Sequence, residues 1–238
     1  MFIMLKKSLM ITRLNLRNCK AAWITAAILF FIIFGQTVVH LILAKNGFDM
    51  SDQSELGSGN FLYLLPLLCA ILIPARNFRR LINLGCKRGD FFWGSLCTYG
   101  VLAAGVSLAN LALYYAFDLP VLRMGVVRDF YNLLDVWGWS ARGAFVAFLR
   151  QSAFLFLGMV FFHTLASLHE WWIGWAVDAL IIAVISVFTP IEPLRNAEYA
   201  FFRAILFQPS AFLQILTCLA LAAALYALNR PILSRRKI

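Results

Sequence analysis

Hydrophobic and polar positions occur in long blocks along this chain, so that six apolar segments are separated by shorter polar ones. A helix needs roughly 20 apolar residues to cross the hydrocarbon layer of a membrane. From this pattern we expect membrane spans at residues 21–44, 61–75, 93–117, 143–168, 171–189 and 209–228. The second span is short and contains Pro66 and Pro74, so we expect it to be kinked or broken.

The composition favours a membrane protein over a water-soluble one. Hydrophobic residues make up 62% of the chain and charged residues only 13%, against about 25% charged in an ordinary soluble domain. The pattern predicts an all-α polytopic membrane protein with six transmembrane helices in one domain, residues 1–238. Within it we expect a basic segment at 1–20, a six-span bundle at 21–228 and a basic tail at 229–238.

Lysine and arginine gather in three of the polar segments. Short cytoplasmic loops of membrane proteins carry an excess of these residues, so we expect the three segments to share the cytoplasmic side, together with both termini. The residues are Lys6, Lys7, Arg13, Arg17 and Lys20 before the first span, Arg76, Arg79, Arg80, Lys87 and Arg88 after the second, and Arg230, Arg235, Arg236 and Lys237 after the sixth. Because they flank spans and form no continuous surface, the net charge of +10 indicates contact with membrane lipids and no nucleic acid.

The basic segment before the first span has a helical pattern. On a helix, Lys6, Arg13, Arg17 and Lys20 fall within about 60° of one another, with leucine, isoleucine and methionine on both sides of them. This arrangement suits a helix that lies in the membrane interface and extends its basic side chains to lipid phosphates. The alternative is an unstructured basic tail that only sets the topology.

The loop after the second span carries the strongest local signal. We expect a short helix at residues 77–84 that ends at Gly85, a turn around Gly89, and Asp90 as the N-cap of the third span. Phe91, Phe92 and Trp93 would then enter the membrane at its interface. The result would be a compact basic knob joined to two spans, although the same residues also fit a simple helix cap with topogenic charges.

Gly85, Arg88, Phe91 and Gly94 form a pattern of the type Gly-x-x-Arg-x-x-Phe followed by an early glycine in the next helix. This pattern resembles the loop between the second and third spans in the six-span permease subunits of bacterial exporter-type ABC transporters, including the small bacteriocin- and lantibiotic-immunity permeases. The resemblance covers the whole chain in topology but only this loop in residues. The chain departs from many relatives by lacking a glutamate before Gly85.

The resemblance implies a permease subunit in a bacterial cytoplasmic membrane that expels an amphipathic peptide, lipid or hydrophobic compound. Its partners would be cytoplasmic ABC ATPase subunits, a second permease chain and membrane lipids. The chain has no Gly-x-x-x-x-Gly-Lys-Ser/Thr motif, so ATP would bind the partner, and no cofactor or metal is expected on this chain. The implied ATPase-coupling loop consists of Gly85, Lys87, Arg88, Asp90, Phe91 and Phe92.

Three ionisable residues fall inside the expected spans and are therefore candidates for function: Asp178, Arg150 and His163. A short turn joins the fourth and fifth spans, so we expect Asp178 to lie at a depth similar to Arg150 and His163 and to pair with either one. Such a pair could serve an intramembrane enzyme, or simply hold two helices together. A non-transporting sensor or scaffold on a permease frame is a third reading of the chain.

Two longer loops are expected on the side opposite the basic segments. Residues 118–142 contain several aromatic side chains, including Trp137 and Trp139, and suggest an interfacial helix or an aromatic belt. Residues 190–208 suggest either a short re-entrant helix pair or a loop lying on the membrane surface.

Overall fold

The computed structural model describes residues 2–49, 52–125 and 129–235. Its α-helices are α1 (Phe2–Asn18), α2 (Lys20–Lys45), α3 (Leu64–Leu72), α4 (Phe78–Asn83), α5 (Arg88–Leu113), α6 (Leu119–Met124), α7 (Leu133–Val136), α8 (Ala144–Leu168), α9 (Trp172–Ala183), α10 (Glu192–Ile205) and α11 (Ala211–Arg235). Short 3-10 helices occur at Ser58–Tyr63 and Ser140–Arg142, and π turns at Ile73–Asn77, Tyr114–Asp118 and Val184–Phe188. Two short strands are β1 (Ser54–Leu56) and β2 (Asp129–Tyr131).

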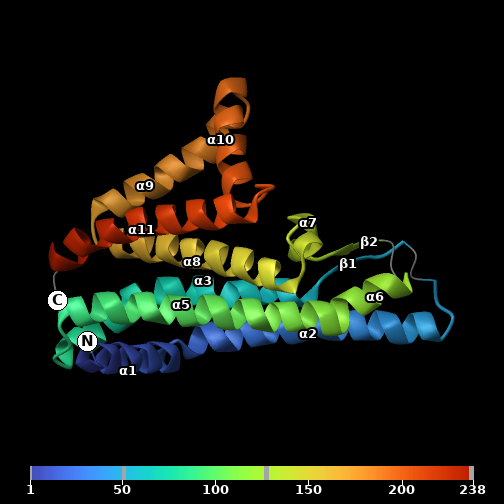
Figure 1. Cartoon of the computed structure of the whole chain (residues 1–238), viewed down its shortest axis with the longest axis horizontal. Coiled ribbons are helices and arrows are strands. Elements are labelled where there is room, and N and C mark those ends of the chain that lie inside the picture. The colour runs from blue at the N-terminus through green and yellow to red at the C-terminus, as the bar shows by residue number, and fades with distance from the viewer. Residues whose placement is uncertain (1, 50–51, 126–128, 236–238) are drawn as a thin grey trace.

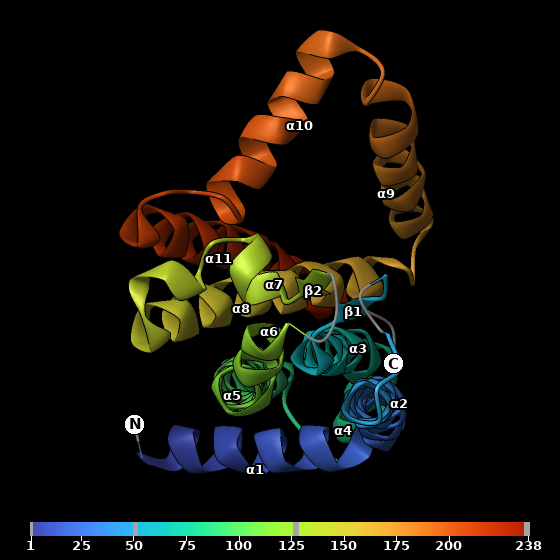
Figure 2. The same cartoon turned by 90° about the vertical axis from the view of Figure 1, so that its right-hand side faces the viewer.

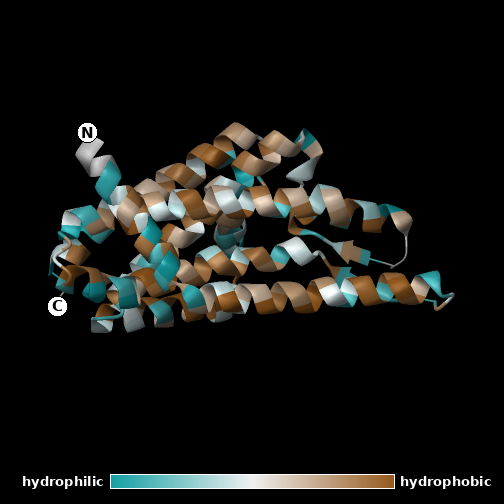
Figure 3. Ribbon diagram, turned by 90° about the horizontal axis from the view of Figure 1, so that it is seen from below, coloured by the Kyte–Doolittle hydropathy of each residue, from teal (hydrophilic) through white to brown (hydrophobic). Residues whose placement is uncertain are grey.

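The long helices run side by side along the longest axis of the molecule (Figure 1). Five continuous helical runs among the described residues are long and apolar enough to cross a membrane: Lys20–Lys45, Ser58–Asn83, Arg88–Met124, Ala144–Leu168 and Ala211–Arg235. The pair α9–α10 makes a sixth if it is counted as one broken span. Hydrophobic residues follow the length of these helices, and hydrophilic residues gather at one end (Figure 3). The chain is therefore a helical protein of the multi-pass membrane type.

Three spans are longer than the hydropathy pattern indicates. The second is not broken, because a π turn at Ile73–Asn77 carries the chain past Pro74, which has no N–H to donate, and into α4. The third continues through Asp118 to Met124. The sixth continues through Pro231 to Arg235, so residues 229–235 form the last turns of α11 and are not a tail. Arg236 and Lys237 lie outside the described residues.

α1 crosses the ends of the other helices instead of running parallel to them (Figure 2). Its backbone breaks at Cys19, and α2 starts at Lys20 in a new direction. The prediction of a helix before the first span is therefore confirmed. α1, α4, the start of α5 and the last turns of α11 lie at one end of the bundle, which we call the basic end (Figure 1).

The opposite end contains a small structure that the sequence pattern did not indicate. β1 and β2 pair in parallel, with Ser54 opposite Asp129. Asp118 is buried beside them and accepts hydrogen bonds from Ser58 Oγ at 3.3 Å and Asn132 Nδ2 at 2.7 Å. These bonds allow a charged residue to lie inside the helical run, which explains why the third span does not end at Phe117.

The aromatic segment after α6 folds back onto the bundle. Trp139 is fully buried, and its Nε1 donates a hydrogen bond to the carbonyl oxygen of Leu206 at 2.9 Å. Leu134 is fully buried as well. The expected surface helix or aromatic belt is therefore wrong for this part of the segment, because its largest side chains form core contacts.

α9 and α10 stand away from the rest of the molecule (Figures 1 and 2). The two helices are bent relative to each other by 113° at a break that includes Pro190. Among their described residues only Gly174 and Ile205 are buried. Residues 190–208 therefore supply one long helix of a bent pair and not a short re-entrant pair of their own.

Candidate functional site

The loop between α4 and α5 is a tight helix ending at the basic end. Gly85 has φ of +85°, a left-handed conformation that glycine adopts without steric cost. The N–H of Gly85 donates to the carbonyl of Ile82 at 2.9 Å, and the N–H of Cys86 donates to that of Leu81 at 3.0 Å. This pair of bonds is the Schellman arrangement that ends many helices. The prediction that the helix ends at Gly85 is therefore confirmed.

α5 begins earlier than the sequence suggested. Its N-cap is Lys87, in an extended conformation, so Asp90 lies within the first helical turn and is not the cap. There its carboxylate lies 3.6 Å from Lys7 Nζ on α1 and near the positive end of the helix dipole, where an acidic group is favourable. The predicted capping role of Asp90 is wrong, but the residue does connect α5 to α1.

The three aromatic residues that follow have different environments. Phe91 is fully buried and packs edge-to-face on Phe78 of the α4 turn, with ring centroids 5.1 Å apart. Phe92 is half-buried, whereas the Trp93 side chain is 54% exposed. Phe91 therefore does not enter the membrane interface as expected, because it packs between α4 and α5. Trp93 remains exposed and can contact lipid.

α1 packs on α5 through a small-residue contact. A Cβ atom on Gly94 would lie 2.5 Å from Ile11 Cγ2 and 2.7 Å from Ile11 Cβ, so only glycine permits this approach. Thr12 Oγ1 donates to the Gly94 carbonyl at 3.4 Å. Asn15 donates to Thr98 Oγ1 at 3.3 Å and accepts from Asn77 at 3.2 Å. The polar face of α1 is therefore turned inward, and its basic residues remain exposed.

These contacts make the basic end a single packed body, which we call the knob: α1, α4, the loop 84–87 and the first two turns of α5. Its surface carries a groove of about 290 Å³, lined by residues of α1, the loop and α5. Leu84 is 74% exposed and Met10 is 65% exposed at this groove. Lys87 is exposed beside Leu84. Arg88 does not line this groove and donates a hydrogen bond to the carbonyl oxygen of Ser234 on α11.

The three ionisable residues inside the spans do not meet. Arg150 donates hydrogen bonds to Gln214 Oε1 and to the carbonyl of Gln208, the latter at 2.5 Å. His163 is fully buried, with Nδ1 2.5 Å from the hydroxyl of Tyr99. Asp178 pairs with neither of them. The expected pairing of Asp178 with Arg150 or His163 is therefore wrong, and the three residues form no common reactive centre.

Asp178 pairs instead with His169, in the turn between α8 and α9. His169 Nε2 lies 2.6 Å from Asp178 Oδ2, and Nδ1 lies 2.8 Å from the carbonyl oxygen of Leu165. Because the Leu165 carbonyl and the Asp178 carboxylate both accept hydrogen bonds, they favour a proton on each nitrogen of the His169 ring. The Leu165 carbonyl and, to a smaller extent, Asp178 raise the pKa of His169 above its ordinary value, against the effect of partial burial. The pair fits a structural contact between two helices.

We expect this contact to depend on pH. Because folding raises the pKa of His169, its stabilising effect is fully present below about pH 6.5, the ordinary value, and is lost as the pH rises through the raised value. Asp178→Asn should lower the free energy of unfolding at pH 6 by about 0.5–1 kcal/mol, since the pair is partly exposed. Melting curves between pH 5.5 and 9 would measure the difference.

Asp52→Asn, the same chemical change at an exposed acid outside the helices, is the control and should have no such effect. His169→Gln should remove the pH-dependent component entirely, whereas Asp178→Asn should remove only part of it, because the Leu165 carbonyl still raises the pKa of His169. A folded Asp178→Asn protein that has lost all activity would instead assign Asp178 to a reactive site.

Sequence reasoning missed several residues that the fold brings together. His169 had a signal, because a histidine in a short turn can reach an acid in the second turn of the helix that follows. Gln214 and Ser234 had none, since each meets its arginine partner only through the packing of α11 against α8 or α5. Compared with protein-family models, curated proteins and solved structures, the chain shows no significant match.

Proposed function

We propose that this chain is the membrane-spanning permease subunit of an ATP-driven exporter of the ABC class, with ATP hydrolysed on a separate cytoplasmic subunit. The observation that supports the proposal is the knob, which is rigidly packed and continuous with two spans. α4 extends the second span without a break, and α5 starts the third after a loop of only four residues. Force applied to the knob would therefore reach both spans directly.

The knob surface has the character of a docking site for a soluble protein. Exposed Leu84 and Met10 offer an apolar centre, Lys7 and Asp90 line the groove as charged residues, and Lys87 is exposed on the adjoining loop. Protein–protein interfaces commonly combine an apolar centre with a polar rim. Arg88 anchors the loop to α11, so a docked partner would also influence the sixth span.

The remaining parts of the proposal concern topology and assembly. The basic end would face the cytoplasm of a bacterial cell under the positive-inside rule, with both termini on that side and α9–α10 as a broken fifth span. α2 is mostly exposed along its length, as are α9 and α10. Such surfaces suit contact with lipid or with a second permease chain. The substrate would be amphipathic, in keeping with the apolar bundle.

The proposal predicts that the purified chain hydrolyses no ATP alone and co-purifies with an ATPase subunit. Leu84→Asp combined with Lys87→Glu should weaken this association at least about tenfold, because it removes an exposed apolar contact and reverses a charge at the knob. The measurement is ATP hydrolysis in tagged chain purified from its native membranes, with the subunit identified by mass spectrometry.

Lys45→Glu is the matched control, because it reverses a charge at the opposite end of α2. It should leave association unchanged. Normal association in the Leu84→Asp/Lys87→Glu variant, at normal protein levels, would contradict the docking assignment.

A further inference from the structure

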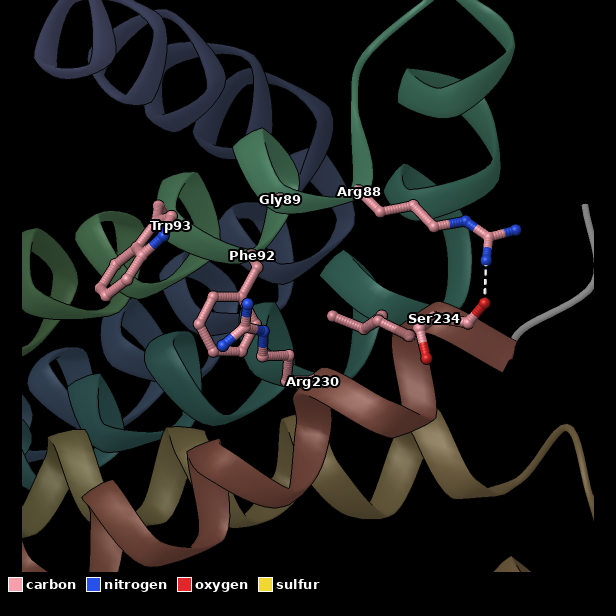
Figure 4. Close-up of a pocket in the computed structure, with 7 residues that line it drawn as sticks. Arg88, Gly89, Phe92, Trp93, Arg230 and Ser234 are labelled. Atoms are coloured by element: carbon pink, nitrogen blue, oxygen red, sulfur yellow. Dashed lines mark hydrogen bonds between the residues drawn. The ribbon is translucent and has the colours of Figure 1, made fainter.

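A groove runs between α5 and α11 from the basic end into the bundle. Its mouth is a hollow of about 350 Å³ at Arg88, Gly89, Arg230 and Ser234 (Figure 4). A second hollow of about 290 Å³ continues from it and is lined by Leu96, Phe156, Leu219, Ala222, Ala223 and Ala227, among others. The two hollows share Phe92 and Trp93, so they form one continuous groove, which we call the α5–α11 groove.

Side-chain size explains why the groove exists. Where α11 lines the inner hollow it carries several alanines, and their small side chains leave space between α11 and α5. Tyr226 closes the floor: its hydroxyl donates to the carbonyl of Phe92 at 2.5 Å, and the two rings lie 4.3 Å apart. Trp93 forms one wall and is 54% exposed, so the groove opens toward the surroundings of the bundle.

Charge is confined to the mouth of the groove. Within the described part of residues 2–235, the two charged residues that line it are both arginines, Arg88 and Arg230. Figure 4 shows one side chain from α5 and one from α11: the Arg88 guanidinium lies at the Ser234 carbonyl, and the Arg230 side chain extends in the other direction. The inner hollow is lined by apolar and aromatic side chains. A ligand that matches both parts has an anionic head and a long apolar body. Arginine suits a phosphate head, because its planar guanidinium donates several charge-assisted hydrogen bonds.

The depth of the groove matches one leaflet of a bilayer. Arg230 and Leu219 are eleven residues apart on α11, which is about 16 Å at the helical rise per residue. The hydrocarbon core of a membrane is about 30 Å thick, so the groove covers roughly half of it. Its charged mouth would lie at the headgroups, and its apolar part would lie among the acyl chains of the same leaflet.

We propose that the α5–α11 groove binds one anionic phospholipid from the leaflet at the basic end. The phosphate lies at the mouth and is bound by Arg230, with Arg88 adding positive charge nearby, and one acyl chain lies along Trp93, Leu96 and the alanines of α11. The bound lipid connects the knob to the last turns of α11. This site does not depend on the proposed transport function, because it requires only that the bundle is embedded in a membrane.

The test uses the full-length chain, purified and delipidated in mild detergent, with bound lipid counted by native mass spectrometry. Dioleoylphosphatidylglycerol should be retained in preference to dioleoylphosphatidylcholine, and glycerol phosphate, which lacks acyl chains, should not be retained. Arg230→Gln should weaken phosphatidylglycerol binding about fivefold, as expected for one basic residue facing an anionic lipid. Ala223→Phe, which fills the groove, should abolish the preference for phosphatidylglycerol.

Two matched variants control for general effects on α11. Arg235→Gln removes an exposed arginine that does not line the groove, and Ala224→Phe enlarges the adjacent exposed alanine. Both should bind phosphatidylglycerol as the parent chain does. The proposal is overturned if Arg230→Gln binds normally or if Ala223→Phe and Ala224→Phe behave alike. Efficient disulfide cross-linking of two Ala223→Cys chains in the membrane would also overturn it, because a second copy would then occupy the groove.

Discussion

Replacing Gly94 with alanine is expected to force α1 away from α5 and to destabilise the whole basic end. The new methyl group would lie 2.5 Å from Ile11 Cγ2 and 2.7 Å from Ile11 Cβ. The second atom is attached directly to the α1 backbone, so a side-chain rotation cannot relieve the clash. Overpacking of this kind typically costs about 1–3 kcal/mol, and the Thr12 bond to the Gly94 carbonyl would lengthen with it.

Hydrogen exchange of the α1 amides and the free energy of unfolding would measure this effect. Gly100→Ala is the control on the same helix, because its Cβ would meet no atom within 4 Å. That change should stabilise α5 by up to about 1 kcal/mol, since alanine is the better helix former. In an Ile11→Gly background, Gly94→Ala should cost nothing further, whereas in an Ile11→Ala background part of its cost should remain, because the Ile11 Cβ atom is still present. Equal effects at Gly94 and Gly100 would show that α1 does not depend on this contact.

Replacing Arg150 with alanine is expected to destabilise the end of the bundle opposite the basic end, where α8 begins. Arg150 is 3% exposed, and its guanidinium holds Gln214 on α11 and the Gln208 carbonyl before it. Each hydrogen bond to a charged group contributes about 1.5–3 kcal/mol, so the free energy of unfolding should fall by about 3 kcal/mol. The guanidinium also lies 6.0 Å from the ring of Trp139, which is favourable for a cation and an aromatic ring.

Arg150→Lys keeps the charge but loses the fork of donors, so it should recover only part of the stability. Arg142→Ala is the control, because Arg142 is exposed in the short 3-10 helix just before α8. Limited proteolysis should detect faster cleavage between α10 and α11 in Arg150→Ala and not in Arg142→Ala. A stable Arg150→Ala protein with an intact α10–α11 connection would show that the connection is held by other contacts.

The sequence predicted the parts of this fold that depend on local composition. Apolar runs located the long helices, and Gly85 located the end of α4, because a left-handed glycine after a helix is a local signal. The pattern failed where a polar residue is satisfied by a distant one. Asp118 looked like the end of a span, yet Ser58 and Asn132 bind its carboxylate from other segments. Hydropathy cannot include partners that are tens of residues away.

The same limit applies to the candidate sites. Gly94 and Phe91 were selected as parts of a loop motif, and their physical roles, contact with Ile11 and contact with Phe78, depend on how α1 and α4 pack. Asp178 was matched to residues at a similar expected depth, whereas the fold offers it His169 in the adjoining turn. The prediction that Asp178 has a polar partner is thus confirmed, and the predicted partner is wrong.

The π turn at Ile73–Asn77 has a consequence for how the second span tolerates change. A π turn contains one residue more than the α-helical ladder would, and one residue corresponds to a rotation of about 100°. The side of the helix that faces the core in α3 is therefore out of phase with the side that faces the core in α4. Phe78 and Leu81, which follow the π turn, are buried in this shifted part of the span. Along this span the number of residues, and not only their hydrophobicity, determines which side chains form the knob.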